Sequence, residues 1–280
     1  MPTIELPSGT IDYDVLGPEE SPHPPLLFIH GIVVDNRVWT PVAELLADAG
    51  FRCVLPTLPL GSHTIPWGAD HDRSPRGAAA LIRDFVAALD LSTATLIAND
   101  TGGALTQMAL DADPDLVAGL VFTNCDAFDV FPPQPFRLII ALMRQPWLLP
   151  ALIRTMRIKA LRHSPIGVGL LITDPDPDLT ASVFEPLRTD ARIRDDLVAF
   201  LRGIDRSELA AVTPRMSRVT VPVTVAWGSD DRCFTPALGR RFADAFPDAR
   251  FIDVPGARTF VSLDQPRVLA DIIASTLAAG

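Results

Sequence analysis

The stretch Thr95-Leu-Ile-Ala-Asn-Asp100-Thr-Gly-Gly-Ala-Leu-Thr-Gln-Met-Ala-Leu110 decides our prediction of the fold. An apolar, β-prone run leads into it, and a helix-prone run of Ala, Leu and Met follows. Between the two runs, Asp100 is followed closely by Gly102 and Gly103. A sharp strand-to-helix turn of this kind presents one side chain at the carboxyl edge of a sheet, and it needs small neighbours because it is cramped. The pattern predicts that the presented side chain is the carboxylate of Asp100.

Apolar runs on both sides of this stretch predict further strands of the same sheet. These runs cover residues 26–30, 51–55, 119–123, 221–227 and 250–254, and helical spacing occupies 38–49, 76–90, 236–245 and 265–279. Residues 3–16 have the pattern of two short strands around the turn signal Pro7-Ser8-Gly9. Because strand and helix alternate, we predict an α/β fold with a mostly parallel central sheet flanked by helices. Ligands of such sheets bind beyond the carboxyl ends of the strands, where His30, the 56–75 loop and Asp100 would meet.

The alternation of strand and helix stops after Asp126. From 131 to about 217 the sequence has prolines and amphipathic helical runs but no convincing strand. A helical cap inserted into the sheet domain is the simplest account. We therefore predict a core domain of residues 1–128 and 218–280, and a helical cap, or lid, of residues 129–217.

The predicted cap has an unusual distribution of charge. Residues 130–173 contain no Asp or Glu, and their cations are Arg137, Arg144, Arg154, Arg157, Lys159 and Arg162. Two interpretations stay open. The cations balance acidic groups elsewhere on the molecule, or they belong to a lid that admits an anionic or interfacial substrate.

Composition excludes several classes of partner and cofactor. The chain has 280 residues, 48% of them hydrophobic, so it can bury a large core. A formal charge of -10 argues against nucleic acid as a partner. Three widely spaced cysteines suggest neither a disulfide framework nor a zinc site, and Gly102-Gly103 alone is no phosphate loop, so we expect no metal and no organic cofactor. With no signal peptide pattern and no apolar run of about 18 residues, we expect a cytoplasmic location and no transmembrane segment. Oligomeric state stays open.

Four motifs together resemble the α/β-hydrolase fold family with a helical cap. They are His30-Gly31 after a strand, Asn99-Asp100-Thr-Gly-Gly103 at the turn, residues 227–236 and residues 255–266. They stand in the family's order, and the resemblance covers essentially the whole chain. It implies that the turn is a nucleophile elbow, that 227–236 is the acid loop and that 255–266 is the final loop.

An aspartate at the elbow is similar to the aspartate-nucleophile branch of that family. This branch includes haloalkane dehalogenases, epoxide hydrolases and fluoroacetate dehalogenases. The resemblance implies that Asp100 attacks an sp³ carbon and forms an alkyl ester, which a histidine oriented by an acid then hydrolyses through water. It also implies that Asp231 is the acid and that the backbone N–H groups of Ile32 and Thr101 stabilise negative charge. A carboxylate suits this attack because it is already ionised at neutral pH.

The chain departs from the family pattern at the position of the histidine. The final loop has Arg258-Thr259 where the family has Gly-His, and no histidine follows His163. Thr259 cannot act as a base at neutral pH. A replacement base remains open, with His63 in the 56–75 loop ahead of the other histidines, which are His23, His71 and His163.

Groups that activate the electrophile in this branch are also missing. Thr101 stands where dehalogenases usually have a tryptophan that holds the halide, and the sole tyrosine, Tyr13, lies in the N-terminal strand pair rather than in the cap. Acidic groups remain instead. Asp126 lies close to the family's alternative acid position, although Asn124 fits that position better by spacing. Carboxylates gathered at one sheet edge raise one another's pKa, and this would let one of them donate a proton. Equally, Asp231 could serve only as a cap for the helix that begins near residue 236.

Three functions are therefore compatible with the sequence. The first is a hydrolase with a non-standard catalytic set, acting on a small to medium apolar electrophile. A second is a non-hydrolytic lyase, isomerase or cyclase, for example in secondary metabolism, in which Asp100 is the general base or acid. The third is a silent homologue that binds a ligand without turnover. Fold alone does not choose between them.

Overall fold

The computed structural model describes residues 2–278, and its strands form an eight-stranded sheet. The strands are β1 (Thr3–Leu6), β2 (Gly9–Leu16), β3 (Leu26–Ile29), β4 (Cys53–Pro56), β5 (Thr95–Asp100), β6 (Gly119–Cys125), β7 (Val223–Gly228) and β8 (Ala249–Val254). Their order across the sheet is β1-β2-β4-β3-β5-β6-β7-β8. The two pairings that involve β2 are antiparallel, whereas all the others are parallel. The predicted α/β fold with a mostly parallel sheet is confirmed.

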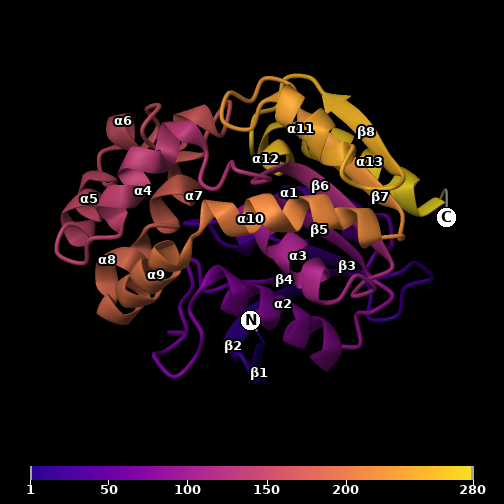
Figure 1. The fold of residues 1–280 in the computed structure, drawn as a ribbon, viewed down its shortest axis with the longest axis horizontal. Coiled ribbons are helices and arrows are strands. Elements are labelled where there is room, and N and C mark those ends of the chain that lie inside the picture. Colours follow the sequence, from indigo (N-terminus) through magenta and orange to yellow (C-terminus); the bar gives the residue numbers. More distant parts are fainter. Residues whose placement is uncertain (1, 279–280) are drawn as a thin grey trace.

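Helices cover both faces of this sheet (Figure 1). The core helices are α1 (Thr40–Asp48), α2 (Pro75–Ala88), α3 (Thr101–Ala112), α11 (Pro236–Ala243), α12 (Val261–Asp264) and α13 (Pro266–Ala278), and the short η1 (Asn36–Trp39) precedes α1. Side chains of α2, α3 and α11 belong to one buried apolar cluster, and side chains of α1 and α13 to a second. Two clusters on opposite faces are what a sheet covered on both sides requires.

The central strands supply side chains to both clusters. Every residue of β5 and β6 is buried. Along β5, Leu96 and Ala98 join one cluster while Ile97 joins the other, because successive strand residues point to opposite faces. This explains why continuous apolar runs predicted these strands. The predicted boundaries shift by a few residues, and the last residue of the helix predicted at 265–279 lies outside the described part of the chain.

Between β6 and β7 the chain forms a succession of short helices, here named the helical segment (residues 131–218). It comprises α4 (Arg137–Met143), α5 (Leu149–Thr155), α6 (Lys159–Arg162), α7 (Pro177–Ser182), α8 (Glu185–Thr189), α9 (Ala191–Gly203), α10 (Arg206–Val212) and the short η2 (Gln134–Phe136), η3 (Val168–Leu170) and η4 (Thr213–Arg218). Helices α4 to α9 gather at one end of the molecule, and α10 returns along the core (Figure 1). None of the helices within 2–278 is long and apolar enough to cross a membrane.

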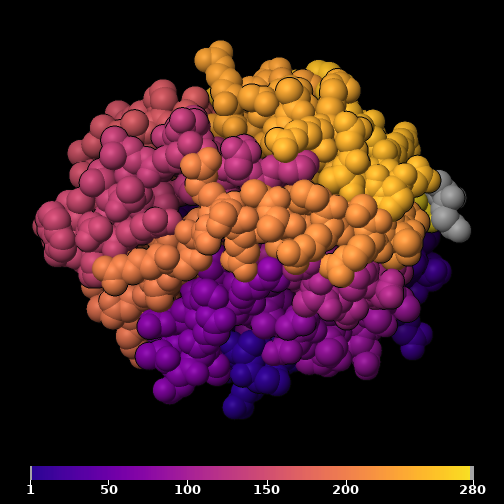
Figure 2. Space-filling view, in the orientation of Figure 1, coloured from indigo at the N-terminus to yellow at the C-terminus, as the bar shows by residue number. Residues whose placement is uncertain are grey.

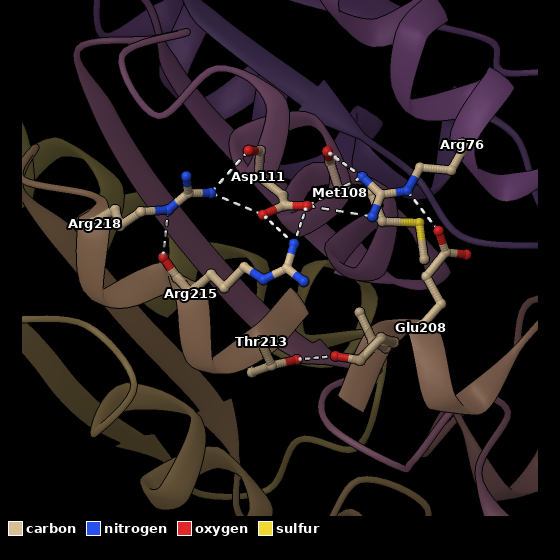
Figure 3. Close-up of polar contacts among 8 residues, drawn as sticks. Arg76, Met108, Asp111, Glu208, Thr213, Arg215 and Arg218 are labelled. Carbon is tan, nitrogen blue, oxygen red and sulfur yellow. Dashed lines mark hydrogen bonds and ion pairs between the residues drawn. The ribbon is translucent and has the colours of Figure 1, made fainter. Parts of the chain in front are cut away.

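The returning end of the helical segment is held to the core by ion pairs around Asp111 on α3 (Figure 3). Arg215 and Arg218 of η4 approach its carboxylate to 3.0 and 2.8 Å. Arg76 of α2 lies 3.3 Å from the same carboxylate, and its Nε donates to Glu208 of α10 at 2.6 Å. Since the Asp111 side chain is only 8% exposed, these pairs are shielded from water more than ordinary surface pairs. They attach α10 and η4 to both α2 and α3.

Candidate active site

Asp100 lies at the strained turn between β5 and α3. Its backbone has φ 52° and ψ -133°, a conformation that costs energy for any residue with a side chain. A Cβ added to Gly102 would lie 2.6 Å from the carbonyl oxygen of His30, and one added to Gly103 would collide with Cys125. The chain can therefore make this turn only with glycine at both positions. The result is a buried carboxylate, 7% exposed, at the carboxyl edge of the sheet.

The loop after β3 passes directly over this carboxylate. A Cβ at Gly31 would collide with Oδ2 of Asp100, so only glycine permits the approach. The backbone N–H of the next residue, Ile32, donates to Asp100 Oδ2 at 3.2 Å. The predicted backbone donor is thus brought to the predicted nucleophile, in the manner of an oxyanion hole.

His30 holds that loop in place and is not free to act as a base. Its Nδ1 lies 2.7 Å from the carbonyl oxygen of Gly31, so Nδ1 must carry the hydrogen, and its Nε2 accepts from the backbone N–H of Leu58 at 2.8 Å. Burial lowers the pKa of His30 to about 4. Both ring nitrogens are therefore committed to the backbone, and the ring stays neutral.

Burial also changes the acidity of Asp100. Loss of solvation raises its pKa from 3.8 to about 6, the backbone N–H groups of Thr101 and Ile32 oppose the rise, and the charge of Asp231 adds to it. At pH 7 a group with this pKa is still mostly ionised. Asp100 is therefore a carboxylate that remains available as a nucleophile but has become more basic.

Asp231, in the loop after β7, is held by four hydrogen bonds. Its Oδ1 accepts from the backbone N–H groups of Cys233 and Phe234 at 2.7 and 3.1 Å. Its Oδ2 accepts from Asn124 Nδ2 at 2.9 Å and from Thr259 Oγ1 at 2.8 Å. Burial, the largest influence, raises its pKa to about 6 despite these donors. Asp231 and Thr259 are thus a bonded pair, in the positions where the resemblance implies the acid and the histidine.

Asn99, the residue before the elbow carboxylate, ties the final loop to the elbow. Its Nδ2 donates to the carbonyl oxygen of Thr259 at 2.7 Å, and also to Thr123 Oγ1 and the carbonyl oxygen of Asn124 at 2.8 and 3.1 Å. Asn124 Oδ1 in turn accepts from the N–H of Gly228 at 2.6 Å. We did not assign these positioning contacts from the sequence, since an asparagine beside a catalytic residue carries no signal of what it will bond.

Asp126 lies near Asp100, but its side chain is buried and does not line the cavity. It is 1% exposed, its Oδ2 accepts from Thr101 Oγ1 at 3.3 Å, and its Oδ1 has no partner in the structure. Burial and then the charge of Asp100 raise its pKa well above 3.8. The Asp126 carboxyl therefore contacts the elbow through Thr101 and does not line the cavity.

His63 is not brought to Asp100. It is 2% exposed, its Nδ1 accepts from the N–H of Gly61 at 3.2 Å, and its Nε2 lies 3.4 Å from Asp196 on α9. The same carboxylate accepts from Trp67 N and Arg73 Nη1 at 2.7 and 3.1 Å. His63 therefore joins the core loop to the helical segment, which gives it a structural role and no route to the elbow.

A cavity of about 140 Å³ lies above Asp100, between the sheet edge and the helical segment. The core contributes Ile32, Val33, Val34, Asp100, Thr101 and Phe260 to its wall. The helical segment contributes Pro132, Pro133, Phe136, Ile139, Ile140, Met143, Leu152, Ile153, Met156, Ile166, Gly167, Val168, Leu171 and Phe184. Only Asp100 and Thr101 among these have polar side chains, so one carboxylate faces an otherwise apolar chamber.

Neither histidines nor cations line this cavity. All five histidines of the sequence fall within the described residues, and none contributes to its wall. The same holds for the six cations of residues 130–173, so the cavity wall holds no cationic side chain to pair with an anionic substrate. Within 2–278 no three side chains of His, Cys, Asp or Glu are grouped so that they could hold a metal ion.

Comparison with known proteins places this geometry in a family. The model of a family described as the alpha/beta hydrolase family matches residues 26–272. An uncharacterised protein of Mycobacterium tuberculosis is 26% identical over 269 residues, which cover 89% of this chain and 74% of that protein. The same organism's haloalkane dehalogenase 2 is 24% identical over 283 residues, covering 91% of this chain and 88% of the relative.

Solved structures agree on the fold. An ancestral haloalkane dehalogenase superimposes with a TM-score of 0.80 at 20% identity, covering 100% of this chain and 99% of the other. A haloalkane dehalogenase from Bradyrhizobium elkani gives 0.78 at 21% identity, with 99% and 98% covered. At 20% and 21% identity, this similarity is evidence for a shared fold and not for a shared reaction.

Proposed function

Since this chain belongs to the alpha/beta hydrolase family, we propose that it is a hydrolase of the aspartate-nucleophile branch. In this proposal Asp100 attacks small to medium apolar electrophiles. The observation that carries it is a single ionised carboxylate, in a strained turn and facing a donor N–H, at the floor of an apolar cavity. Among the relatives, haloalkane dehalogenase 2 supports the same class of electrophile.

The first step is a substitution at an sp³ carbon. One oxygen of Asp100 forms a bond to that carbon while the carbon–halogen bond breaks, and the halide leaves with the bonding electron pair. Thr101 cannot hold a halide as a tryptophan would, and no tyrosine in the described residues faces the cavity to protonate an opening epoxide. Primary alkyl bromides and iodides fit best, because their leaving groups depart without help.

The second step hydrolyses the ester with an unusual catalytic set. Water adds to the ester carbonyl while the N–H groups of Ile32 and Thr101 stabilise the negative oxygen. Thr259 takes a proton from this water as it passes its own hydroxyl proton to Asp231, and the proton returns to the departing alcohol. Asp231, with its pKa near 6, is a better acceptor than an ordinary carboxylate but a weaker base than histidine. The step is therefore slow, and the alkyl ester accumulates.

We assign residues 129–217 the role of a cap over this site. The helical segment supplies most of the cavity wall, while the core supplies the carboxylate and its backbone donors. Substrate size and polarity are then set by α4, α5 and the loop around Ile166. Because the helical segment contributes no charged side chain to the wall, and the only charged group there is the carboxylate of Asp100, we propose an uncharged substrate in place of the anionic one that the sequence left open.

Intact mass spectrometry tests the proposal. The protein is incubated with 1-bromobutane, and the expected result is a rise by one butyl group, located by peptide mapping on Asp100. The Asp100→Asn variant is the control and should stay unmodified. Rapid release of butanol and bromide with no adduct would still support a hydrolase, but it would show that the second step is fast. The proposal would be contradicted if no primary halide gave either an adduct or released halide.

One observation favours a second function, acid–base catalysis without a covalent intermediate. With its pKa near 6, Asp100 is poised to exchange a proton close to neutral pH, as an isomerase or lyase requires. The test is incubation of apolar carbonyl compounds in D₂O. Incorporation of deuterium beside the carbonyl that is lost in Asp100→Asn, with no alkyl adduct from halides, would favour this function. Binding of such compounds without exchange or adduct would point to the silent homologue.

A further inference from the structure

Large apolar side chains are exposed mainly in one part of the molecule. In the described chain, five of the seven exposed large hydrophobic residues lie between 138 and 166. They are Leu138 at 72% exposure, Leu142 at 36%, Trp147 at 77%, Ile158 at 55% and Ile166 at 63%, and together they are here named the apolar patch. Such a concentration of exposed apolar groups marks an interaction site more often than chance.

The elements that carry the patch divide their side chains between the cavity and solvent. On α4, Ile139, Ile140 and Met143 line the cavity, whereas Leu138 and Leu142 are exposed. Helices α4, α5 and α6 lie together at the end of the molecule farthest from the C-terminus (Figure 1), and their outer surface forms the corresponding end of the space-filling view (Figure 2). The patch is therefore an outward surface that the chain itself leaves uncovered.

Cations without acidic partners accompany the patch. The 130–173 stretch has six Arg and Lys residues and no Asp or Glu, although the whole chain carries a formal charge of -10. None of the six forms an ion pair with another described residue. Arg154, Arg157 and Lys159 are exposed. The local field is positive enough that Arg157 contributes to lowering the pKa of Arg188, after burial.

The patch and the cavity wall share one residue. Ile166 is 63% exposed and also lines the cavity above Asp100. A molecule that enters beside Ile166 would pass from the patch to the carboxylate through apolar surroundings. Ile166 thus belongs both to the patch and to the cavity wall.

We propose that this end of the molecule docks on the surface of a lipid bilayer that contains anionic lipids. Exposed Trp and Leu side chains suit the boundary between headgroups and acyl chains, and unpaired Arg and Lys are attracted to anionic headgroups. A second copy of the chain would bring like charges together, which opposes a symmetric dimer through the same surface. If Asp100 acts as proposed above, docking would place the cavity mouth where apolar substrates dissolve. The docking itself does not depend on that function.

Fluorescence of Trp147 gives a direct measurement of docking. The other tryptophans, Trp39, Trp67 and Trp227, are at most 3% exposed, so a spectral change on binding reports Trp147. With vesicles of phosphatidylcholine and phosphatidylglycerol, the emission should shift to shorter wavelength and the protein should sediment with the lipid. Pure phosphatidylcholine vesicles and added salt should weaken both effects.

Two pairs of variants decide whether the surface is the one proposed. Arg154→Gln with Arg157→Gln should lower the partition coefficient by about tenfold, whereas Arg250→Gln with Arg267→Gln, which removes equal charge from exposed sites elsewhere, should change it little. Leu138→Ser should weaken sedimentation more than the matched Val268→Ser, which removes an exposed apolar group from α13.

Three results would overturn the proposal. The first is that the protein does not bind anionic vesicles. The second is that the matched control variants lose as much vesicle binding as the patch variants. The third is that the patch forms a dimer or a protein complex but does not bind vesicles. Asp100→Asn should dock like the unmodified protein. Docking is therefore judged independently of whether Asp100 reacts with any electrophile.

Discussion

The elbow and the final loop lie in contact, yet they differ in how much of the family's chemistry they retain. At the elbow, the strained φ of Asp100, the glycines that follow and the N–H of Ile32 are all present. In the final loop the frame persists, because Thr259 is bonded to Asp231 and to Asn99, but its side chain cannot accept a proton on its own. If Asp100 and Thr259 act as proposed, positioning and proton transfer are separable in this protein. We expect the step that needs only the elbow to be fast relative to the step that needs both.

Of the changes considered, removal of the elbow carboxylate should have the largest effect on the rate of alkylation. In Asp100→Asn the rate of alkylation by a primary bromide should fall by about 10³-fold or more, because an amide is a far weaker nucleophile than a carboxylate. The rate is measured from the growth of the adduct mass. Asp230→Asn, an exposed carboxylate in the acid loop, is the matched control and should react normally. If the alkylation rate fell comparably in both variants, the rate would depend on the overall negative charge of the protein and not on the elbow carboxylate.

Changing the acid loop should affect only the second step. In Asp231→Asn the proton acceptor for Thr259 is gone, so breakdown of the alkyl ester should slow by about 10- to 100-fold while its formation is nearly unchanged. Formation and breakdown are followed separately, by mixing with excess bromide and then removing it. If ester formation and ester breakdown slowed equally in Asp231→Asn, the elbow and the final loop could not be assigned to separate steps.

Alkylation should depend on pH as the elbow carboxylate titrates. With the pKa of Asp100 near 6, the ionised fraction and hence the rate should rise by about tenfold between pH 5 and pH 7, then level off. Breakdown of the ester cannot follow this titration, since Asp100 is then esterified. A rate of alkylation that is already constant at pH 5 would argue against the buried setting of the nucleophile.

The same pKa shift has a smaller consequence for stability. Asp100 binds its proton more tightly in the folded state, where the pKa is about 6, than in the unfolded chain, where it is near 3.8. Folding is therefore favoured by this group at low pH, and the advantage is lost as pH rises between these values. At pH 7, Asp100→Asn should raise the free energy of unfolding by about 1–3 kcal/mol, and the gain should vanish at pH 4. Urea unfolding at both pH values measures the difference in free energy of unfolding between the two proteins. If Asp100→Asn were still more stable at pH 4, the raised pKa of Asp100 in the folded state would be wrong.

Local patterns in the sequence were enough for most of the fold and for the elbow. The β5 stretch predicted strand, turn and helix because glycine and apolar residues act through short-range geometry. The roles of the acid loop and of the Thr259 position came from the resemblance to the family, and they stay predictions. Contacts over long separations could not be predicted: His63 pairs with Asp196, and Asn99 bonds to the backbone of Thr259. Such partners depend on how the helical segment and the final loop pack, which no local pattern encodes.

The lifetime of the alkyl ester in the unmodified protein and in Thr259→His tests the central claim most directly. After alkylation and removal of excess bromide, loss of the adduct mass is followed in both proteins. A histidine at this position would meet Asp231 and could accept a proton from water, so breakdown should accelerate by about 10²- to 10⁴-fold while alkylation changes little. An ester that breaks down equally fast in both proteins, or that never forms in either, would contradict the account.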